Sequence, residues 1–184
     1  MRRFFSNTFI IAGIILLGIG VYLVWERNSP KRVSFDVAPP EQKGSMVELA
    51  TLPQGRPVGI RIPSIDKQLA VIPSKIVNNR WESTKEGVSH LSTSPVPGEL
   101  GNSVLYGHNY PNLLKDLPKV KVGDEIVIVF ENGGEKKFEV YFTQEVGPNQ
   151  SSILNPTNDY RITLYTCSGF LDSKRFVVTA MLKQ

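Results

Sequence analysis

Residues 124–143 read DEIVIVFENGGEKKFEVYFT, and this stretch indicates the fold class of the chain. A run rich in β-branched residues at 124–130 is followed by a glycine-bearing turn at 132–134 and by a second strand-like run at 137–143. Two such runs around a short turn that contains glycine are typical of a β-hairpin. The stretch therefore predicts that antiparallel strands organise the surrounding domain.

Further short strands are expected on both sides of this hairpin. Helix patterns are weak there and amount to a turn or two near residues 113–117 and 81–85. Short strands at such spacing favour a closed barrel or a sandwich, so residues 57–184 are predicted to form one all-β domain. The additional strands are expected at 59–65, 69–72, 102–106, 161–166 and 175–182.

The N-terminal part of the chain has a different character. Residues 8–25 form an uncharged apolar stretch that, as a helix, would extend roughly 27 Å and span a bilayer core. Arg2 and Arg3 precede it and favour a cytoplasmic location for residues 1–7, and the proline-punctuated residues 26–56 are expected to be a linker. The sequence thus predicts a single-pass membrane anchor with the domain outside the cell. A cleaved signal peptide is the alternative, but the aromatic residues that follow the stretch fit an anchor better.

Length, composition and charge place the chain among ordinary globular proteins. The 184 residues, of which 41% are hydrophobic, suit one domain with appendages. The net charge of +4 is spread along the chain and includes no long basic run. The charge pattern therefore gives little support to nucleic-acid binding.

Cys167 is the only cysteine in the chain, and it ends a strand-like run at 160–167. In oxidising compartments cysteines usually occur in even numbers and pair as disulfides. A lone cysteine in an exported domain has no partner in its own chain. Three interpretations stay open at this point: a buried spectator, an intermolecular link, or a reactive nucleophile.

Two other residues have the chemistry to work with a thiol. His108 lies just past the strand expected at 102–106, and Arg175 begins the last expected strand. An imidazole can exchange a proton with a thiol and with a leaving amine, and a fixed guanidinium can stabilise an oxyanion. One cysteine and two histidines lack the spacing of a zinc site, so no metal or cofactor is expected. Sequence spacing alone does not establish that the three residues are close.

Three motifs occur together in this chain: GELGNSVLYGH at 98–108, TLYTC at 163–167 and SKRFVV at 173–178. TLYTC matches the TLxTC signature of the sortases, the membrane-anchored cysteine transpeptidases of bacterial surfaces. The other two are similar to the stretches that carry the catalytic histidine and the catalytic arginine of that family. The resemblance covers roughly residues 59–182 and is closest to the small class D and class E sortases.

The resemblance implies a closed eight-stranded sortase-type β-barrel with short helices. It also implies that Cys167 is the nucleophile, that His108 is the acid and base, and that Arg175 stabilises the oxyanion or the substrate. Thr166 matches the signature threonine that helps to shape the substrate site. His90 resembles a second histidine of the family, and we expect it to be structural.

The activity implied by the resemblance is cleavage of a C-terminal LPxTG-like sorting signal and transfer of the surface protein to an amine of cell wall or pilin. Another cysteine acyltransferase or peptidase of the cell surface is one alternative. The Ser/Thr-His-Gly-Cys signature of L,D-transpeptidases is absent from the sequence, however, and papain-like peptidases place cysteine before histidine. A non-catalytic membrane-tethered β-domain is the other alternative, and the presence of Cys, His and Arg together is evidence against it.

Overall fold

Eight strands close into a single barrel, to which one N-terminal helix is attached. The computed structural model describes residues 2–27, 33–40, 55–77 and 80–183. Around the barrel the strands follow the order β1-β2-β5-β6-β9-β10-β8-β7. The closed eight-stranded barrel predicted from the sequence is therefore confirmed. Its strands are β1 (Pro57–Ile62), β2 (Lys67–Ser74), β5 (Gly87–Leu91), β6 (Gly101–Gly107), β7 (Glu125–Phe130), β8 (Glu135–Val146), β9 (Tyr160–Ser168) and β10 (Lys174–Leu182).

Short elements fill the connections between these strands. A two-stranded ribbon joins β3 (Ile76–Val77) to β4 (Arg80–Trp81) outside the barrel. Single 3₁₀ turns occur at η3 (Pro63–Ile65), η4 (Leu117–Lys119), η5 (Ser151–Leu154) and η6 (Phe170–Asp172).

The hairpin predicted from residues 124–143 is β7–β8. Ile126 lies opposite Phe138 in the antiparallel register, and Gly133 takes a φ of 82° in the turn, which favours glycine. Two other expectations need correction. No strand was expected over the residues of β5, and the helical turn expected near residues 81–85 is absent, because β4 ends at Trp81 and an irregular segment follows it.

The barrel interior is an apolar core to which every one of the eight strands contributes. Side chains alternate between the two faces of a strand, so residues such as Ile60, Leu105, Phe138, Leu164 and Val178 point inward and are fully buried. Each large apolar side chain removed from water in this way stabilises the fold by about 1.5–3 kcal/mol. We call the buried apolar side chains of the barrel interior, of which these five are examples, the inner core.

A second apolar cluster covers the outside of β6, β9 and β10. We call it the outer cluster; it consists of Val33, Phe35, Trp81, Leu91, Val104, Tyr106, Val146, Leu154, Tyr165, Cys167 and Val177. Because Leu164 faces the inner core and Tyr165 faces the outer cluster, β9 is buried on both faces. Its sequence is nevertheless not uniformly apolar, because Thr163 and Thr166 interrupt the run and are themselves buried.

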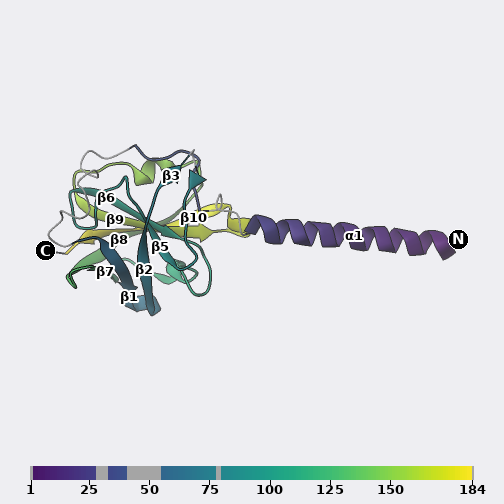
Figure 1. Cartoon of the computed structure of the whole chain (residues 1–184), viewed down its shortest axis with the longest axis horizontal. Helices are drawn as coiled ribbons and strands as arrows, with labels where there is room; N and C mark the ends of the chain where they lie inside the picture. Colours follow the sequence, from purple (N-terminus) through teal and green to yellow (C-terminus); the bar gives the residue numbers. More distant parts are fainter. Residues whose placement is uncertain (1, 28–32, 41–54, 78–79, 184) are drawn as a thin grey trace.

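Helix α1 (Arg2–Arg27) extends away from the barrel (Figure 1). Between residues 9 and 25 its large apolar side chains are exposed. Across the described ranges of the chain, however, no helix combines the length and the apolar character needed to cross a membrane. The transmembrane helix predicted over residues 8–25 is therefore not supported by the structure.

Candidate active site

The pairing of three neighbouring strands brings His108, Cys167 and Arg175 into a row. Strands β6 and β9 run parallel with Gly107 opposite Thr166, so the next residues, His108 and Cys167, lie beside each other. Strands β9 and β10 run antiparallel with Cys167 directly opposite Arg175. Neighbouring strands are about 4.8 Å apart, so Arg175 lies roughly one strand spacing from the cysteine, and the end of β6 that leads into His108 flanks it on the other side.

The row lies in a largely desolvated part of the surface. Cys167 is 3% exposed, Arg175 3% and His108 5%. Cys167 belongs to the outer cluster together with Tyr165 and Val177, which share its strand face. Low water content around a thiol, an imidazole and a guanidinium strengthens the electrostatic interactions among them.

His108 is held by contacts on both its ring face and its edge. Its Nε2 lies 3.1 Å from Ser83 Oγ, and its ring stacks on Tyr110 with the centroids 4.9 Å apart and the planes 10° from parallel. Burial lowers the pKa of His108; Lys85 lowers it further, and the carboxylate of Asp172 raises it. The imidazole is therefore neutral at neutral pH and able to accept a proton.

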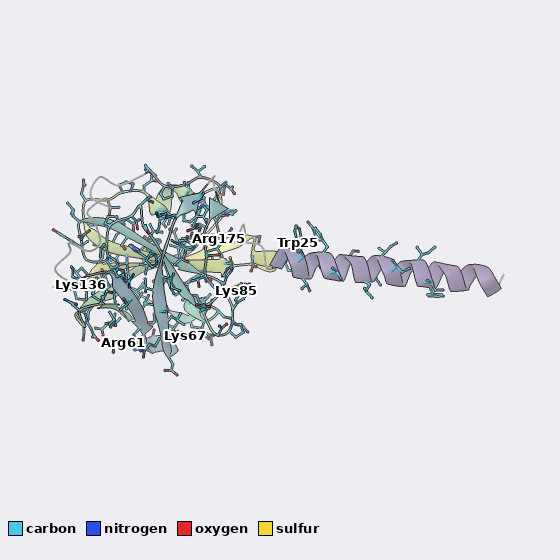
Figure 2. The ribbon with its side chains drawn as sticks, in the orientation of Figure 1. Trp25, Arg61, Lys67, Lys85, Lys136 and Arg175 are labelled. Atoms are coloured by element: carbon cyan, nitrogen blue, oxygen red, sulfur yellow. The ribbon has the colours of Figure 1, made fainter. Side chains whose placement is uncertain are left out.

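Arg175 is anchored by backbone carbonyls. Its Nη1 donates to the carbonyl oxygens of Asp172 and Lys174, each at 2.9 Å, and its Nη2 donates to that of Ser34 at 2.8 Å. Its Nε is buried and has no hydrogen-bond partner among the residues that the structure describes. A fixed cation with an unused donor is suited to bind an oxygen that gains negative charge. In Figure 2, Arg175 and Lys85 both lie on the part of the barrel nearer to α1.

The loop that joins β9 to β10 has an unusual backbone. Gly169, Leu171 and Asp172 all have positive φ values, of 75°, 52° and 59°. For leucine and aspartate this left-handed conformation is unfavourable. The Asp172 carboxylate accepts a 2.7 Å hydrogen bond from Asn109 Nδ2, so this loop is tied to the residue that follows His108.

A part of the segment predicted to be a linker packs against the outer cluster. Val33 and Phe35 are 0% and 3% exposed, and the Phe35 ring meets that of Tyr165 edge to face at 5.0 Å. The Asp36 N–H donates to Pro148 O at 2.9 Å. We call residues 33–40 the N-terminal strap. Through the Ser34 carbonyl it occupies one of the donors of Arg175.

Two other residues singled out in the sequence have mainly structural contacts. Thr166 is fully buried, and its hydroxyl donates to Gly107 O at 2.8 Å, so it fixes the strand end that presents His108. His90 is buried in β5 with its Nε2 3.1 Å from Pro95 O. Burial lowers the pKa of His90 to about 4, which agrees with the structural role expected for it.

Sequence reasoning missed several neighbours of the row: Ser83, Asn109, Tyr110, Asp172 and the strap. Asn109 and Tyr110 directly follow His108, and Asp172 comes three residues before Arg175, so their proximity in the chain was a usable signal. Ser83 carries no such signal, because only the fold brings the residues after β4 to the histidine.

In the described ranges no group of three or more His, Cys, Asp or Glu residues could hold a metal ion.

Comparison with known proteins gives a consistent result. The family model described as sortase domain matches residues 60–183. The chain is 30% identical over 168 residues to sortase A of Listeria monocytogenes serovar 1/2a (strain ATCC BAA-679 / EGD-e), which covers 86% of this chain and 72% of that protein. The solved structure of Listeria monocytogenes sortase A is similar with 28% identity and a TM-score of 0.57, covering 70% of this chain and 88% of that one. The structure of sortase A from Corynebacterium diphtheriae is also similar, with 25% identity and a TM-score of 0.63. That match covers 94% of this chain and 84% of the other.

Proposed function

This chain belongs to the sortase family, and we propose on that premise that it is a cysteine transpeptidase that cleaves an LPxTG-like sorting signal and transfers the surface protein to an amine of cell wall or pilin. The observation that carries the proposal is the row of His108, Cys167 and Arg175 across β6, β9 and β10. A nucleophile that lies between a proton carrier on one neighbouring strand and a fixed cation on the other provides the groups that acyl transfer needs.

The first half of the proposed reaction forms a thioester. Cys167 Sγ, having passed its proton to His108, attacks the carbonyl carbon of the scissile peptide bond. The negative charge that develops on the carbonyl oxygen is stabilised by the Arg175 guanidinium. The C–N bond then breaks, and His108 gives its proton to the departing amine. The leaving peptide carries a new amino terminus, and the acyl group stays on Sγ.

The second half transfers the acyl group. The acceptor amine attacks the thioester carbonyl, His108 takes the proton that the amine loses, and the C–S bond breaks. The products are a new amide and the free thiolate, which recovers a proton from His108. An acceptor that is bound beside the thioester has a higher effective concentration than a nucleophile that must reach it from free solution.

Formation of the acyl-enzyme tests the first half. The full chain in detergent is mixed with an LPxTG-like peptide, and the intact protein is measured by mass spectrometry. We expect an adduct on Cys167 in the native chain and none in Cys167→Ala. An adduct on another residue, or unchanged turnover in the variant, contradicts the proposed nucleophile.

The fate of the acyl group separates a transpeptidase from a cell-surface cysteine peptidase. A panel of amines that includes cell-wall cross-bridge mimics and pilin lysine peptides is added, and the ratio of ligated to hydrolysed product is measured. We expect one class of amine to divert product to the ligated form and to raise total turnover. If every amine leaves only hydrolysed peptide at an unchanged rate, the peptidase alternative replaces the transpeptidase.

We also propose that the barrel works outside the cell membrane. Helix α1 exposes apolar side chains such as Phe9 (76%), Leu17 (72%) and Trp25 (72%), and exposed apolar surface of this extent marks a contact with lipid or protein. The test is protease treatment of intact cells. We expect the barrel to be digested; protection until the cells are lysed contradicts this location.

A further inference from the structure

Asp172 connects the two loops that carry the reactive row. Its side-chain Oδ1 accepts the hydrogen bond from Asn109 Nδ2 at 2.7 Å, and Asn109 is the residue after His108. Its backbone oxygen accepts the hydrogen bond from Arg175 Nη1 at 2.9 Å. One residue thus contacts both the histidine loop and the arginine side chain.

We propose that Asp172 is a positioning residue, which, through Asn109 on one side and Arg175 on the other, fixes the His108 loop relative to the hairpin that carries Cys167 and Arg175. The proposal rests on the proposed function, because it concerns the alignment of the groups that perform the transfer. Strand pairing determines where β6 and β9 lie. His108 follows the last residue of β6, however, and is therefore beyond the ladder that holds the strand.

The backbone conformation of Asp172 supports this role. Residues other than glycine are strained at positive φ, and they persist there where the surrounding structure determines their conformation. Asp172 has a φ of 59° and follows Leu171 at 52°. Glycine at position 172 would take the same turn without strain, so the turn by itself gives no reason for a carboxylate there. The contact with Asn109 does.

Charge provides an independent reason. Besides burial, which lowers the pKa of His108, Lys85 also lowers it and Asp172 raises it; the ring contacts Ser83 and Tyr110 as well. The Asp172 carboxylate therefore offsets part of the effect of Lys85 and favours the imidazolium that must form when the thiol gives up its proton.

Three variants of the full chain separate the hydrogen bond, the charge and the turn. Asn109→Ala removes the hydrogen bond and keeps the charge, and Asp172→Asn removes the charge and keeps an acceptor for Asn109. Asp172→Gly removes both but relieves the strained backbone. The matched control is Asp66→Gly: Asp66 is also an aspartate at positive φ, 49°, in the turn after η3 and outside the three strands of the row.

The expected result is a loss of turnover without a loss of stability. We expect kcat to fall about tenfold in Asn109→Ala and more in Asp172→Gly, with KM within about twofold and with the thermal midpoint of Asp172→Gly equal to or above that of the native chain. Asp66→Gly should keep native kcat. Asp172→Gly with native kcat and KM overturns the proposal, because the residue then only shapes the turn.

Two readouts need no peptide and separate this proposal from the proposed function. The chain has two histidines, so an NMR titration resolves both. In Asp172→Asn the midpoint of His108 should move to lower pH, while His90 serves as the unchanged internal reference. Alkylation of Cys167 by iodoacetamide at neutral pH should slow about threefold in Asn109→Ala, because the thiol loses its aligned base. If both readouts match the native chain, the proposal fails, even if the native chain forms the acyl-enzyme. If the readouts change and no peptide forms an adduct, it is the sortase activity that fails.

Discussion

The inner core and the outer cluster use the same strands for different purposes. Strand β9 gives Ile162 and Leu164 to the inner core and Tyr165 and Cys167 to the outer cluster. The inner core consists of aliphatic and phenylalanine side chains from all eight strands. The outer cluster carries polar atoms, among them the Tyr106 hydroxyl, which donates to Glu82 O, and the thiol itself. The comparison indicates that the inner face of β9 stabilises the fold, whereas the outer face carries the residues that we propose to perform the transfer.

The largest expected effect is on stability and comes from the inner core. Phe138 is fully buried there, and Phe138→Ala should lower the free energy of unfolding by about 3–5 kcal/mol, because it removes apolar contacts and leaves a cavity. Denaturant unfolding measures this loss. Activity per folded molecule should stay near native; a large fall in kcat at a temperature where the variant is folded would break the division between the two faces.

For Arg175, on the outer face, we expect a loss of activity and little loss of stability. Arg175→Lys should lower kcat/KM about a hundredfold, which corresponds to about 2.7 kcal/mol of transition-state stabilisation. An ammonium cannot reproduce the planar donors that now reach three carbonyl oxygens. Steady-state kinetics with the sorting peptide and urea unfolding are measured together. Near-native kcat/KM in this variant contradicts the geometric role of the guanidinium.

The two histidines extend the comparison to pH. The pKa of His90 in the folded chain is about 4, below the ordinary value of 6.5. Between these two pH values the unfolded chain therefore binds a proton at His90 that the folded chain does not bind. The stability from this group is complete above pH 6.5 and is lost as the pH falls towards 4, by about 1.4 kcal/mol per unit. Between pH 6.5 and 5 the loss should be about 2 kcal/mol.

The measurement for His90 is urea unfolding at both pH values in the native chain and in His90→Gln. The variant should lose less stability on acidification than the native chain does, and it should keep substantial activity when folded. An equal loss in both proteins means that other groups cause the acid sensitivity.

The smallest expected effect concerns the N-terminal strap. Phe35→Ala should lower stability by about 1–2 kcal/mol, because the side chain packs on the barrel from outside. It should also lower KM a few-fold, since a loosened strap frees Arg175 Nη2 from the Ser34 carbonyl and offers a substrate a second donor beside the unused Nε. Peptide kinetics measure the change in KM. Val37→Ala, in the same segment at a position that is 60% exposed, is the control and should change neither quantity.

Much of the barrel was predictable from local sequence. The β7–β8 hairpin followed from its apolar runs and its glycine turn, and β6, β9 and β10 followed from similar runs. The signal failed at β5, where Gly87, Ser89 and His90 do not read as a strand. These residues are nevertheless buried, because β5 lies between β2 and β6 in the barrel. Tertiary contacts outweigh propensity in such a strand.

The three residues of the proposed active site were predictable as types, and the contacts around them were not. Cys167, His108 and Arg175 stood out through chemistry and motif, but the place of His108 in their row depends on the pairing of β6 with β9, two segments that are distant in the sequence. The strap illustrates the same limit. Val33 and Phe35 lie in a polar, proline-rich region, and only the aromatic surface of Trp81 and Tyr165 explains why they are buried.

The strap has a practical consequence for anyone who prepares the barrel without α1. A fragment cut at the start of β1 would lose Val33 and Phe35 and leave the rings of Trp81 and Tyr165 facing water. Bare aromatic surface of this kind promotes association between molecules, and the resulting aggregates would hide the thiol. A fragment that starts ahead of Val33 keeps the patch covered and should remain monodisperse at the concentrations that peptide screening requires.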